Sequence, residues 1–397
     1  MDRQGQIDLL KRLLHYVDTR TTHLADEPWH NDVTVYTDPQ RFAHEQEVLF
    51  RQHPLLMGFA SEWSTPGAFR TDNYAGVPLL IVRGRDTKLR AFLNVCRHRG
   101  AKVALGCGKA RVFACPYHAW TYDLAGKLTG VPDECSFPGV RAERSTLTQL
   151  PLCEKYGLVW VIPTPATNSG TEFDIDPWLA GLGPELDAYG FGSWAFFDRR
   201  MVSETMNWKL LIDTFHEAYH VGFLHRDSLR GILHGNVTDF EPFGLNHRMT
   251  VPRKKLSRLK TEPEESWDLM WNTTLAYSLF PNSVLIVQGD HVELARIFPN
   301  EGRPDCAVME LALYVPPTTT TKEENTHWDK NMQLILDVVA GEDFPVARSI
   351  QGGLASGAQS HVIYGRNESA IIHYHRSMRT ALSLCAADVT SAPGCVR

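Results

Sequence analysis

The first fifty residues have the periodicity of helices. Apolar side chains in the first segment recur at the spacing of one helical face, at positions Ile7, Leu9, Leu10, Leu13 and Leu14. Proline, asparagine and aspartate residues interrupt the pattern between positions 27 and 39. We therefore expect residues 1–50 to form an N-terminal helical segment that packs on a later domain.

The pattern changes to short β-rich runs between residues 51 and 162. Gly, Pro and Asp turns separate these runs, which are Val77–Val82, Leu89–Val95, Arg111–Ala114, Ala119–Tyr122 and Gly157–Ile162. Short strands joined by tight turns predict a small antiparallel β-domain. A polar stretch from Pro163 to Asp176 then marks a domain boundary.

Residues 163–397 combine helical and strand patterns. A helical pattern covers residues 207–224, and a second, longer one covers His327–Ala340 after a polar connection. Apolar runs between them predict antiparallel strands at Ser283–Val287, His291–Phe298 and Ala307–Val315. This part is predicted to be an α+β domain with a curved antiparallel sheet and a long helix.

Composition adds limits to this picture. At 397 residues the chain is long enough for two domains, and its net charge of -6 gives no indication of nucleic-acid binding. No apolar run approaches the roughly 20 residues that cross a bilayer, and the charged N-terminus lacks the apolar core of a signal peptide. We expect a cytoplasmic protein with no membrane or nucleic-acid partner. The 17 histidines direct the search for chemistry toward metal sites.

Two short segments each offer one thiolate and one imidazole. Cys96 and His98 are followed by Gly100, and Cys115 and His118 follow in the second segment. A structural zinc site is the alternative, but zinc sites usually pair Cys with Cys and His with His. Two equivalent mixed halves instead suit a two-iron cluster, in which one iron takes both sulfurs and the other both nitrogens.

A second group of histidines and acids follows at positions 213–225. Ideal helix geometry favours the pair His216 and His220, which are four residues apart on one face. His220 and His225 could share a metal only if the helix ends or bulges between them, which Gly222 would allow. Two histidines and one carboxylate on one face are the ligands of non-haem Fe(II) oxygenases.

These motifs resemble those of the Rieske non-haem iron oxygenases, the superfamily of aromatic ring-hydroxylating dioxygenases and quaternary-ammonium monooxygenases. The matching segments are NVCRHRGAKV, ACPYHAWTYDLAGKL, DTFHEAYH and GEDFPVARSIQGGL, and the resemblance extends from about Tyr36 to Leu382. Respiratory Rieske proteins carry an additional Cys in each cluster loop, where this chain has Ala101 and Tyr117. The cluster therefore resembles the lower-potential kind found in oxygenases.

The resemblance implies a set of ligands. The [2Fe-2S] cluster would be held by Cys96, His98, Cys115 and His118. The mononuclear Fe(II) would be held by His220, His225 and Asp343. His216 would then line the site, and Glu342 is the rival of Asp343 for the third position.

The resemblance also implies an architecture and partners. It implies a Rieske domain at residues 51–162 and a helix-grip catalytic domain at residues 163–397. In the family an acidic residue, here Glu217, links a cluster histidine of one subunit to an iron histidine of its neighbour, which implies His118, His220 and a homotrimer. The chain has no Gly-rich dinucleotide fingerprint, so a separate NAD(P)H-dependent reductase, and possibly a ferredoxin, is expected to supply electrons.

The sequence constrains the identity of the substrate less than it constrains the fold or the metal ligands. We expect mono- or dioxygenation of a small aromatic or hydrophobic compound by this terminal oxygenase component. The alternative is a monooxygenase or demethylase of a quaternary ammonium compound. Most ring-hydroxylating members carry Asp at the position of Glu217, and a Glu there resembles the branch that oxidises quaternary ammonium compounds. Alternatives of other classes are a Rieske electron-transfer protein without oxygenase activity and a former oxygenase that only binds ligands.

Overall fold

The structure, a computed structural model, describes residues 1–73, 76–166, 172–300, 302–317 and 321–383. The chain forms two compact units. The larger unit comprises Met1–Glu45, Asp176–Tyr189 and Ser193–Arg397, and the smaller one comprises Gln46–Ile175 and Gly190–Gly192. The division into functional domains at 1–50, 51–162 and 163–397 stays a prediction, and residues 167–171 of its polar boundary lie outside the described ranges.

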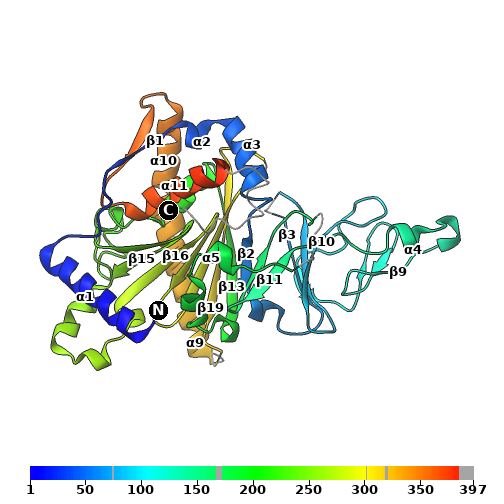
Figure 1. Ribbon diagram of the computed structural model, residues 1–397, viewed down its shortest axis with the longest axis horizontal. Helices are drawn as coiled ribbons and strands as arrows, with labels where there is room; N and C mark the ends of the chain where they lie inside the picture. Colours follow the sequence, from blue (N-terminus) through cyan, green and yellow to red (C-terminus); the bar gives the residue numbers. More distant parts are fainter. Residues whose placement is uncertain (74–75, 167–171, 301, 318–320, 384–397) are drawn as a thin grey trace. The chain divides into compact units, whose positions relative to one another are not determined.

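A seven-stranded antiparallel sheet forms the centre of the larger unit (Figure 1). The strands are ordered β13-β19-β18-β17-β16-β15-β14. Their bounds are β13 (Ala195–Glu204), β14 (Asp239–Phe243), β15 (Asn246–Pro252), β16 (Thr273–Leu279), β17 (Ser283–Val287), β18 (Val292–Pro299) and β19 (Ala307–Val315). Strands β15, β17, β18 and β19 are buried along their whole length because neighbouring elements cover both faces of the sheet.

Helices and a two-stranded sheet complete the larger unit. Helix α11 packs on β14 and β15, and α7 packs on β18 and β19. The α-helical bounds are α1 (Arg3–Thr19), α2 (Thr34–Thr37), α3 (Pro39–Val48), α5 (Asp176–Leu179), α6 (Gly183–Asp187), α7 (Trp208–Asp213), α8 (Leu269–Asn272), α9 (Lys322–Val338), α10 (Phe344–Ala355) and α11 (Ser369–Ser383). Strand β1 (Trp29–Asp32) pairs with β20 (His361–Tyr364).

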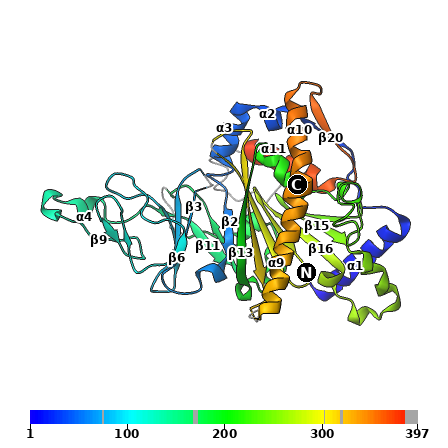
Figure 2. The same cartoon turned by 180° about the vertical axis from the view of Figure 1, so that it is seen from behind.

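Short 3-10 segments and one π-helical turn connect these elements. The 3-10 turns are η3 (Phe191–Ser193), η4 (His220–Gly222), η5 (Lys254–Thr261) and η6 (Glu264–Ser266). A π-helical turn, η7 (Val339–Asp343), joins α9 to α10, so the three form one continuous helical rod along the sheet (Figure 2). Pro345 at the start of α10 has no N–H to donate, and a wider turn before it avoids the clash that proline makes inside an α-helix.

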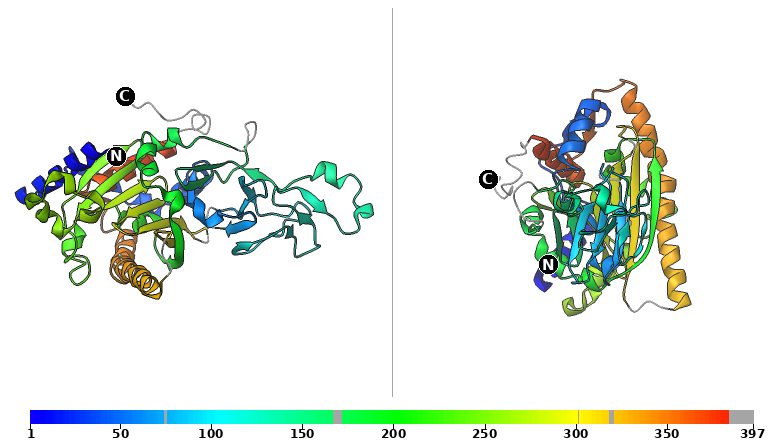
Figure 3. Two further views of the ribbon diagram at one scale, coloured as in Figure 1. Left: turned by 90° about the horizontal axis from the view of Figure 1, so that it is seen from below. Right: turned by 90° about the vertical axis from the view of Figure 1, so that its right-hand side faces the viewer.

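The smaller unit is built of short antiparallel strands (Figure 3). Its sheets are β10-β5-β4-β3-β6, β11-β12-β2 and β7-β8-β9. The bounds are β2 (Leu55–Phe59), β3 (Ala68–Asp72), β4 (Leu79–Arg83), β5 (Leu89–Leu93), β6 (Cys107–Lys109), β7 (Phe113–Ala114), β8 (Thr121–Tyr122), β9 (Leu128–Gly130), β10 (Gln149–Leu150), β11 (Leu152–Lys155) and β12 (Leu158–Val161), with the turns η1 (Ala60–Trp63), η2 (Glu134–Ser136) and α4 (Val140–Glu143). The predicted α+β class with antiparallel sheets is confirmed.

The helix predicted over residues 207–224 is too long. Helix α7 begins after the N-cap Asn207 and ends at Asp213. Beyond it, the Glu217 carboxylate accepts hydrogen bonds from the backbone N–H groups of Tyr219 and His220. A side chain that binds nearby backbone donors competes with the helical hydrogen bonds, so the chain turns away from a helix here.

None of the helices in the described ranges combines the length and apolar character needed to span a membrane.

Candidate metal centres

The two cysteine–histidine loops of the smaller unit have the same backbone hydrogen bonds. In the first loop the amide of Gly100 donates to the carbonyl of Cys96 at 3.0 Å, and in the second the amide of Ala119 donates to that of Cys115 at 2.9 Å. The amides of Cys96 and Cys115 in turn donate to the residue five positions ahead, Ala101 and Trp120 respectively. Two loops of equal geometry thus present one thiol and one imidazole each.

A positive φ at the fourth residue after each cysteine makes this geometry possible. Gly100 has φ 85° and Ala119 has φ 55°. Glycine reaches this conformation without strain, whereas Ala119 adopts it at a cost of about 1 kcal/mol or more. The sequence suggests a turn at Gly100 but gives no such signal at Ala119.

The thiols are buried and the imidazoles are nearer the surface. The Tyr122 hydroxyl lies 3.4 Å from Cys96 Sγ and accepts a hydrogen bond from the Arg97 amide at 2.9 Å. Burial is the largest effect on Cys96 and raises the pKa of its thiol. The rings of His98 and His118 lie 4.8 Å apart, and the thiols of Cys96 and Cys115 are within hydrogen-bond reach of each other.

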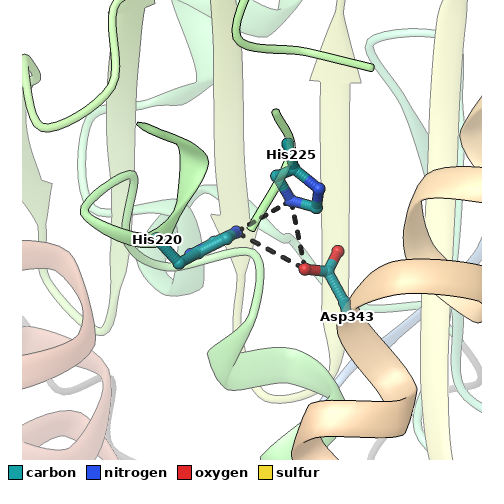
Figure 4. Close-up of side chains that lie close together, drawn as sticks. All are labelled: His220, His225 and Asp343. Carbon is teal, nitrogen blue, oxygen red and sulfur yellow. Dashed lines mark hydrogen bonds and ion pairs between the residues drawn. The ribbon is translucent and has the colours of Figure 1, made fainter. Parts of the chain in front are cut away.

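A second group of donors lies in the larger unit, where His220, His225 and Asp343 point toward one another (Figure 4). The Nε2 atoms of the two histidines are 3.1 Å apart. Asp343 Oδ1 lies 3.5 Å from Nε2 of His220 and 3.1 Å from Nε2 of His225. All three atoms lie within 4.8 Å of one another.

The end of α7 and the π-helical turn bring these residues together. Because α7 ends at Asp213, His220 sits on η4 and His225 follows it in a loop, which removes the angular separation of an ideal helix. Asp343 is the last residue of η7, and its side chain is buried. A π-helical turn rotates the following residue relative to a regular α-helix, and such turns are frequent at functional sites.

A carboxylate lies behind each imidazole. Glu217 Oε1 contacts Nδ1 of His220, and Glu342 Oε2 lies 2.6 Å from Nδ1 of His225. The Ser228 hydroxyl donates to the same Glu342 oxygen at 2.9 Å. Because a carboxylate acceptor lies against each Nδ1, each neutral imidazole carries its ring proton on Nδ1. Each Nε2 then directs a lone pair toward Asp343.

Three acceptor atoms that face one another require a positive charge. Burial lowers the pKa of His220, but its hydrogen bond with Glu217 and the charge of Asp343 outweigh burial and raise it. Burial likewise lowers the pKa of His225, and the carboxylates of Asp343 and Glu342 reverse that effect. A site that attracts protons in this way fits a metal cation, and two imidazoles with one carboxylate suit non-haem iron.

The two other candidate iron ligands raised from the sequence, His216 and Glu342, do not point into the group of His220, His225 and Asp343. His216 lies outside the group, with its ring 4.8 Å from that of His247 and 4.7 Å from that of Tyr374. Glu342 does not join the converging atoms but binds His225 from the opposite side. The sequence reasoning treated Glu342 only as a rival ligand and missed this contact.

A buried hydrogen-bond network near the end of α7 was also missed. Asp213 accepts a hydrogen bond from the Tyr36 hydroxyl at 2.6 Å and lies 3.0 Å from Nε2 of His375. The Tyr364 hydroxyl lies 3.3 Å from the same imidazole nitrogen. Residues so far apart in sequence leave no local signal of their contact.

A cavity of about 360 Å³ adjoins the His220, His225 and Asp343 group. Apolar side chains of the sheet and of α9 form much of its lining, and polar side chains gather at Gln288–Glu293. This size and this mixture of apolar walls with a few polar groups are typical of sites for small molecules. The arrangement can therefore hold a small substrate against a metal ion.

Two family models match parts of the chain. Residues 53–144 match the Rieske [2Fe-2S] domain, and residues 191–384 match the catalytic domain of the ring-hydroxylating alpha subunit. The chain is therefore a Rieske-type non-haem iron oxygenase, an oxidoreductase whose cofactors are a Rieske [2Fe-2S] cluster and a mononuclear iron.

Individual relatives refine this assignment. The chain is 27% identical to the carnitine monooxygenase oxygenase subunit of Escherichia coli (strain K12), over 88% of this chain and 92% of that protein. It is 31% identical to the biphenyl 2,3-dioxygenase subunit alpha of Rhodococcus jostii (strain RHA1), over 59% of this chain and 51% of that protein. The quaternary ammonium Rieske monooxygenase CntA in complex with L-carnitine superposes with a TM-score of 0.75 at 22% identity, covering 91% of this chain and 97% of that one, which shows a shared fold.

Proposed function

We propose that the chain is the terminal oxygenase component of a monooxygenase that acts on a quaternary ammonium compound. The extent of the match to the carnitine monooxygenase subunit carries this proposal. That similarity covers 88% of the chain, whereas the similarity to the biphenyl dioxygenase subunit covers 59%. The alternative raised from the sequence is thus better supported than the first expectation of an aromatic or hydrophobic substrate.

The composition of the cavity supports the same choice. Among the described lining residues the carboxylates are Glu217, Asp290, Glu293 and Asp343, and Arg253 carries the permanent positive charge. Phe215 and Trp271 are the phenyl and indole rings of that lining. A cationic head is favoured near carboxylates, and aromatic faces attract methylated ammonium groups. A hydrocarbon would gain nothing from these carboxylates.

The proposed ligands follow from the donors described above. Cys96, His98, Cys115 and His118 would hold the cluster, since their loops offer two thiolates and two imidazoles in equivalent positions. His220, His225 and Asp343 would hold the mononuclear iron. When bound, the two centres supply electron transfer and the activation of dioxygen.

The chain's own residues prepare the iron site for this chemistry. Glu217 and Glu342 hold the Nδ1 protons of His220 and His225, which fixes the orientation of both rings. Apolar side chains around the cavity exclude water from the position of the substrate. We further propose that Glu217 links His220 to His118 of a neighbouring subunit in a homotrimer, and that a separate reductase supplies the electrons.

An electron-transfer protein without oxygenase activity would need only the Rieske unit. The second unit here matches an oxygenase catalytic domain and brings two imidazoles and a carboxylate together beside a cavity. A protein that only bound ligands would not need these convergent acceptor atoms. The oxygenase proposal accounts for both sites.

The proposal is tested by a single turnover with chemically reduced, iron-loaded protein and ¹⁸O-labelled dioxygen. Choline, carnitine, glycine betaine, benzoate and biphenyl are offered separately, and products are analysed by mass spectrometry. Incorporation of label into a quaternary ammonium compound, or into the aldehyde that its cleavage releases, supports the proposal. Incorporation into an aromatic compound alone contradicts it.

A further inference from the structure

The cavity extends well beyond the His220, His225 and Asp343 group. The lining residues of the rod include Asn331 on α9 and Asp343 at the end of η7. These two positions are about three helical turns apart on one rod, which is roughly 18 Å at about 1.5 Å per residue. A substrate that filled this length would be considerably longer than choline.

The walls between the two ends are apolar. Leu334, Ile335 and Val338 line the side formed by α9. On the sheet, Met249, Ala276, Ile286 and Glu293 are direct partners in adjacent strands and form one row across β15 to β18. Such a row shares one face of the sheet, so the apolar wall ends at the carboxylate of Glu293.

The far end of the cavity is a polar cluster that we name the distal pole, composed of Arg253, Gln288, Asp290, His291, Glu293 and His327. His291 lies 2.8 Å from Asp290 through Nδ1 and 3.1 Å from Glu293 Oε1 through Nε2. His327 Nε2 lies 3.0 Å from the second oxygen of Asp290. Burial lowers the pKa of His291, but the hydrogen bonds to both acids outweigh it and raise the pKa to about 9.

One acceptor of the distal pole has no hydrogen-bond partner among the described residues. Glu293 is 4% exposed, and its Oε2 atom is buried without a hydrogen bond. An unsatisfied buried carboxylate oxygen is costly, and native structures rarely keep one without a functional reason. Because Glu293 lines the cavity, a group bound there can satisfy this oxygen.

We propose that the distal pole recognises the far end of an elongated substrate, from which Glu293 Oε2 accepts an O–H or N–H hydrogen bond. This inference rests on the proposed function for the other end of the molecule, where the methylated head would lie at the His220, His225 and Asp343 group. The substrate class is an alkyl quaternary ammonium ion with a spacer longer than that of choline and a terminal hydroxyl or ammonium group. Arg253 places a positive charge at the same pole, so a terminal amino acid group, with both an ammonium and a carboxylate, also fits.

The test is isothermal titration calorimetry on the full-length protein and its Glu293→Gln variant. One series comprises alkyl trimethylammonium ions of increasing length that end in methyl, hydroxyl, ammonium or an amino acid group. A second series replaces the trimethylammonium head with a tert-butyl group, which has the same shape without the charge. Glutamine keeps the size of the side chain but replaces the free acceptor with a donor.

A terminal donor should tighten binding to the native protein about tenfold or more over the methyl-ended compound of equal length. The Glu293→Gln variant should lose that gain, so that donor-ended and methyl-ended compounds of equal length bind it alike, and its measurable binding of the methyl-ended compounds also shows that it is folded. Equal binding of all termini, a gain that survives in the variant, or no binding by either series overturns the proposal.

The two series separate this inference from the proposed function. If ammonium-headed compounds bind without any effect of the terminus, the proposed role of the distal pole is refuted and the quaternary ammonium proposal stands. If only tert-butyl-headed compounds bind, and the terminal donor still tightens their binding, the distal pole stands and the quaternary ammonium proposal fails. The hydroxyl, ammonium and amino acid arms identify which terminus the pole prefers.

Discussion

Glu217 and Glu342 give the two imidazoles of the candidate iron site the same support. Each carboxylate contacts the Nδ1 of one histidine and leaves its Nε2 directed at Asp343. Glu342 is itself held by Ser228. Outer contacts of this kind orient metal ligands and raise their basicity. Their loss therefore changes metal affinity without removing a ligand.

We predict that Glu342→Gln weakens iron binding about 10- to 100-fold, the usual effect of losing an outer partner of a ligand histidine. The measurement is a titration of the apo protein with Fe(II), with the cluster absorbance recorded in parallel. The cluster should be unchanged. Asp337→Asn is a matched control, because Asp337 is an exposed acid that accepts a hydrogen bond from Gln333. Native iron affinity in Glu342→Gln would refute the role of Glu342.

Glu217→Gln, supplied with enough Fe(II) to fill its weakened site, should hold both metal centres and slow electron transfer between them. The amide keeps the size of the side chain but loses the negative charge that the proposed link between subunits requires. The measurement is the rate of cluster oxidation in a single turnover, together with an iron count. A normal rate in the variant would mean that Glu217 does not mediate electron transfer.

Local sequence patterns indicated the candidate donors but not the residues that contact them. Cys96, His98, Cys115 and His118 lie in two short loops, and the family motif encodes them directly. The contact between Glu342 and His225 joins residues on different elements, so no local spacing indicates it. Ideal helix geometry favoured His216 over His225 because it assumed a helix through residue 224, and α7 ends at Asp213.

At the scale of elements, the buried strands rich in apolar residues were predicted most accurately. Strands β17, β18 and β19 lie within one residue of the predicted bounds because burial on both faces leaves mostly apolar residues at successive positions. Strand β13 is only partly buried and carries several charges, so its pattern was not recognised. Helix α9 begins five residues earlier than predicted because Thr321 and Glu324 form a capping box.

The π-helical turn at Val339–Asp343 yields a prediction for the element that carries Asp343. Deletion of Gly341 would convert the wide turn to a regular α-helical one and shift Asp343 by about 100° relative to α9. We expect the deletion variant to lose mononuclear iron while it keeps the cluster. Gly341→Ala is the control, since a Cβ there meets no atom within 4 Å and the register is unchanged. Iron retention in the deletion variant would contradict the proposed function of the turn.

At the scale of the whole molecule, buried neutral histidines make stability depend on pH. His216 and His247 are buried with no hydrogen-bond partner among the described residues. Burial lowers the pKa of His216 to about 3 and that of His247 well below its usual value. Below about pH 6.5 the unfolded chain binds protons that the folded chain does not, so stability falls as the pH decreases.

We predict that each of these histidines removes up to about 1.4 kcal/mol of stability per pH unit below about pH 6.5. The measurement is the unfolding of the larger unit in urea at several pH values between pH 7.5 and pH 5. His216→Phe should reduce the slope of the unfolding free energy against pH by the contribution of one histidine. His15→Gln, which replaces an exposed histidine, should leave that slope unchanged. An unchanged slope in His216→Phe would show that His216 is not neutral in the folded protein.

The central claim is that a quaternary ammonium compound opens electron flow from the cluster to dioxygen at the second iron. Its most direct test is optical re-oxidation of the chemically reduced cluster on mixing with oxygen, with and without quaternary amines, aromatic acids or hydrocarbons. We predict that a quaternary amine accelerates re-oxidation, that His220→Ala abolishes the acceleration with the cluster intact, and that Cys96→Ser lacks the cluster signal. Acceleration by an aromatic compound alone, or equal acceleration in His220→Ala, would contradict the claim.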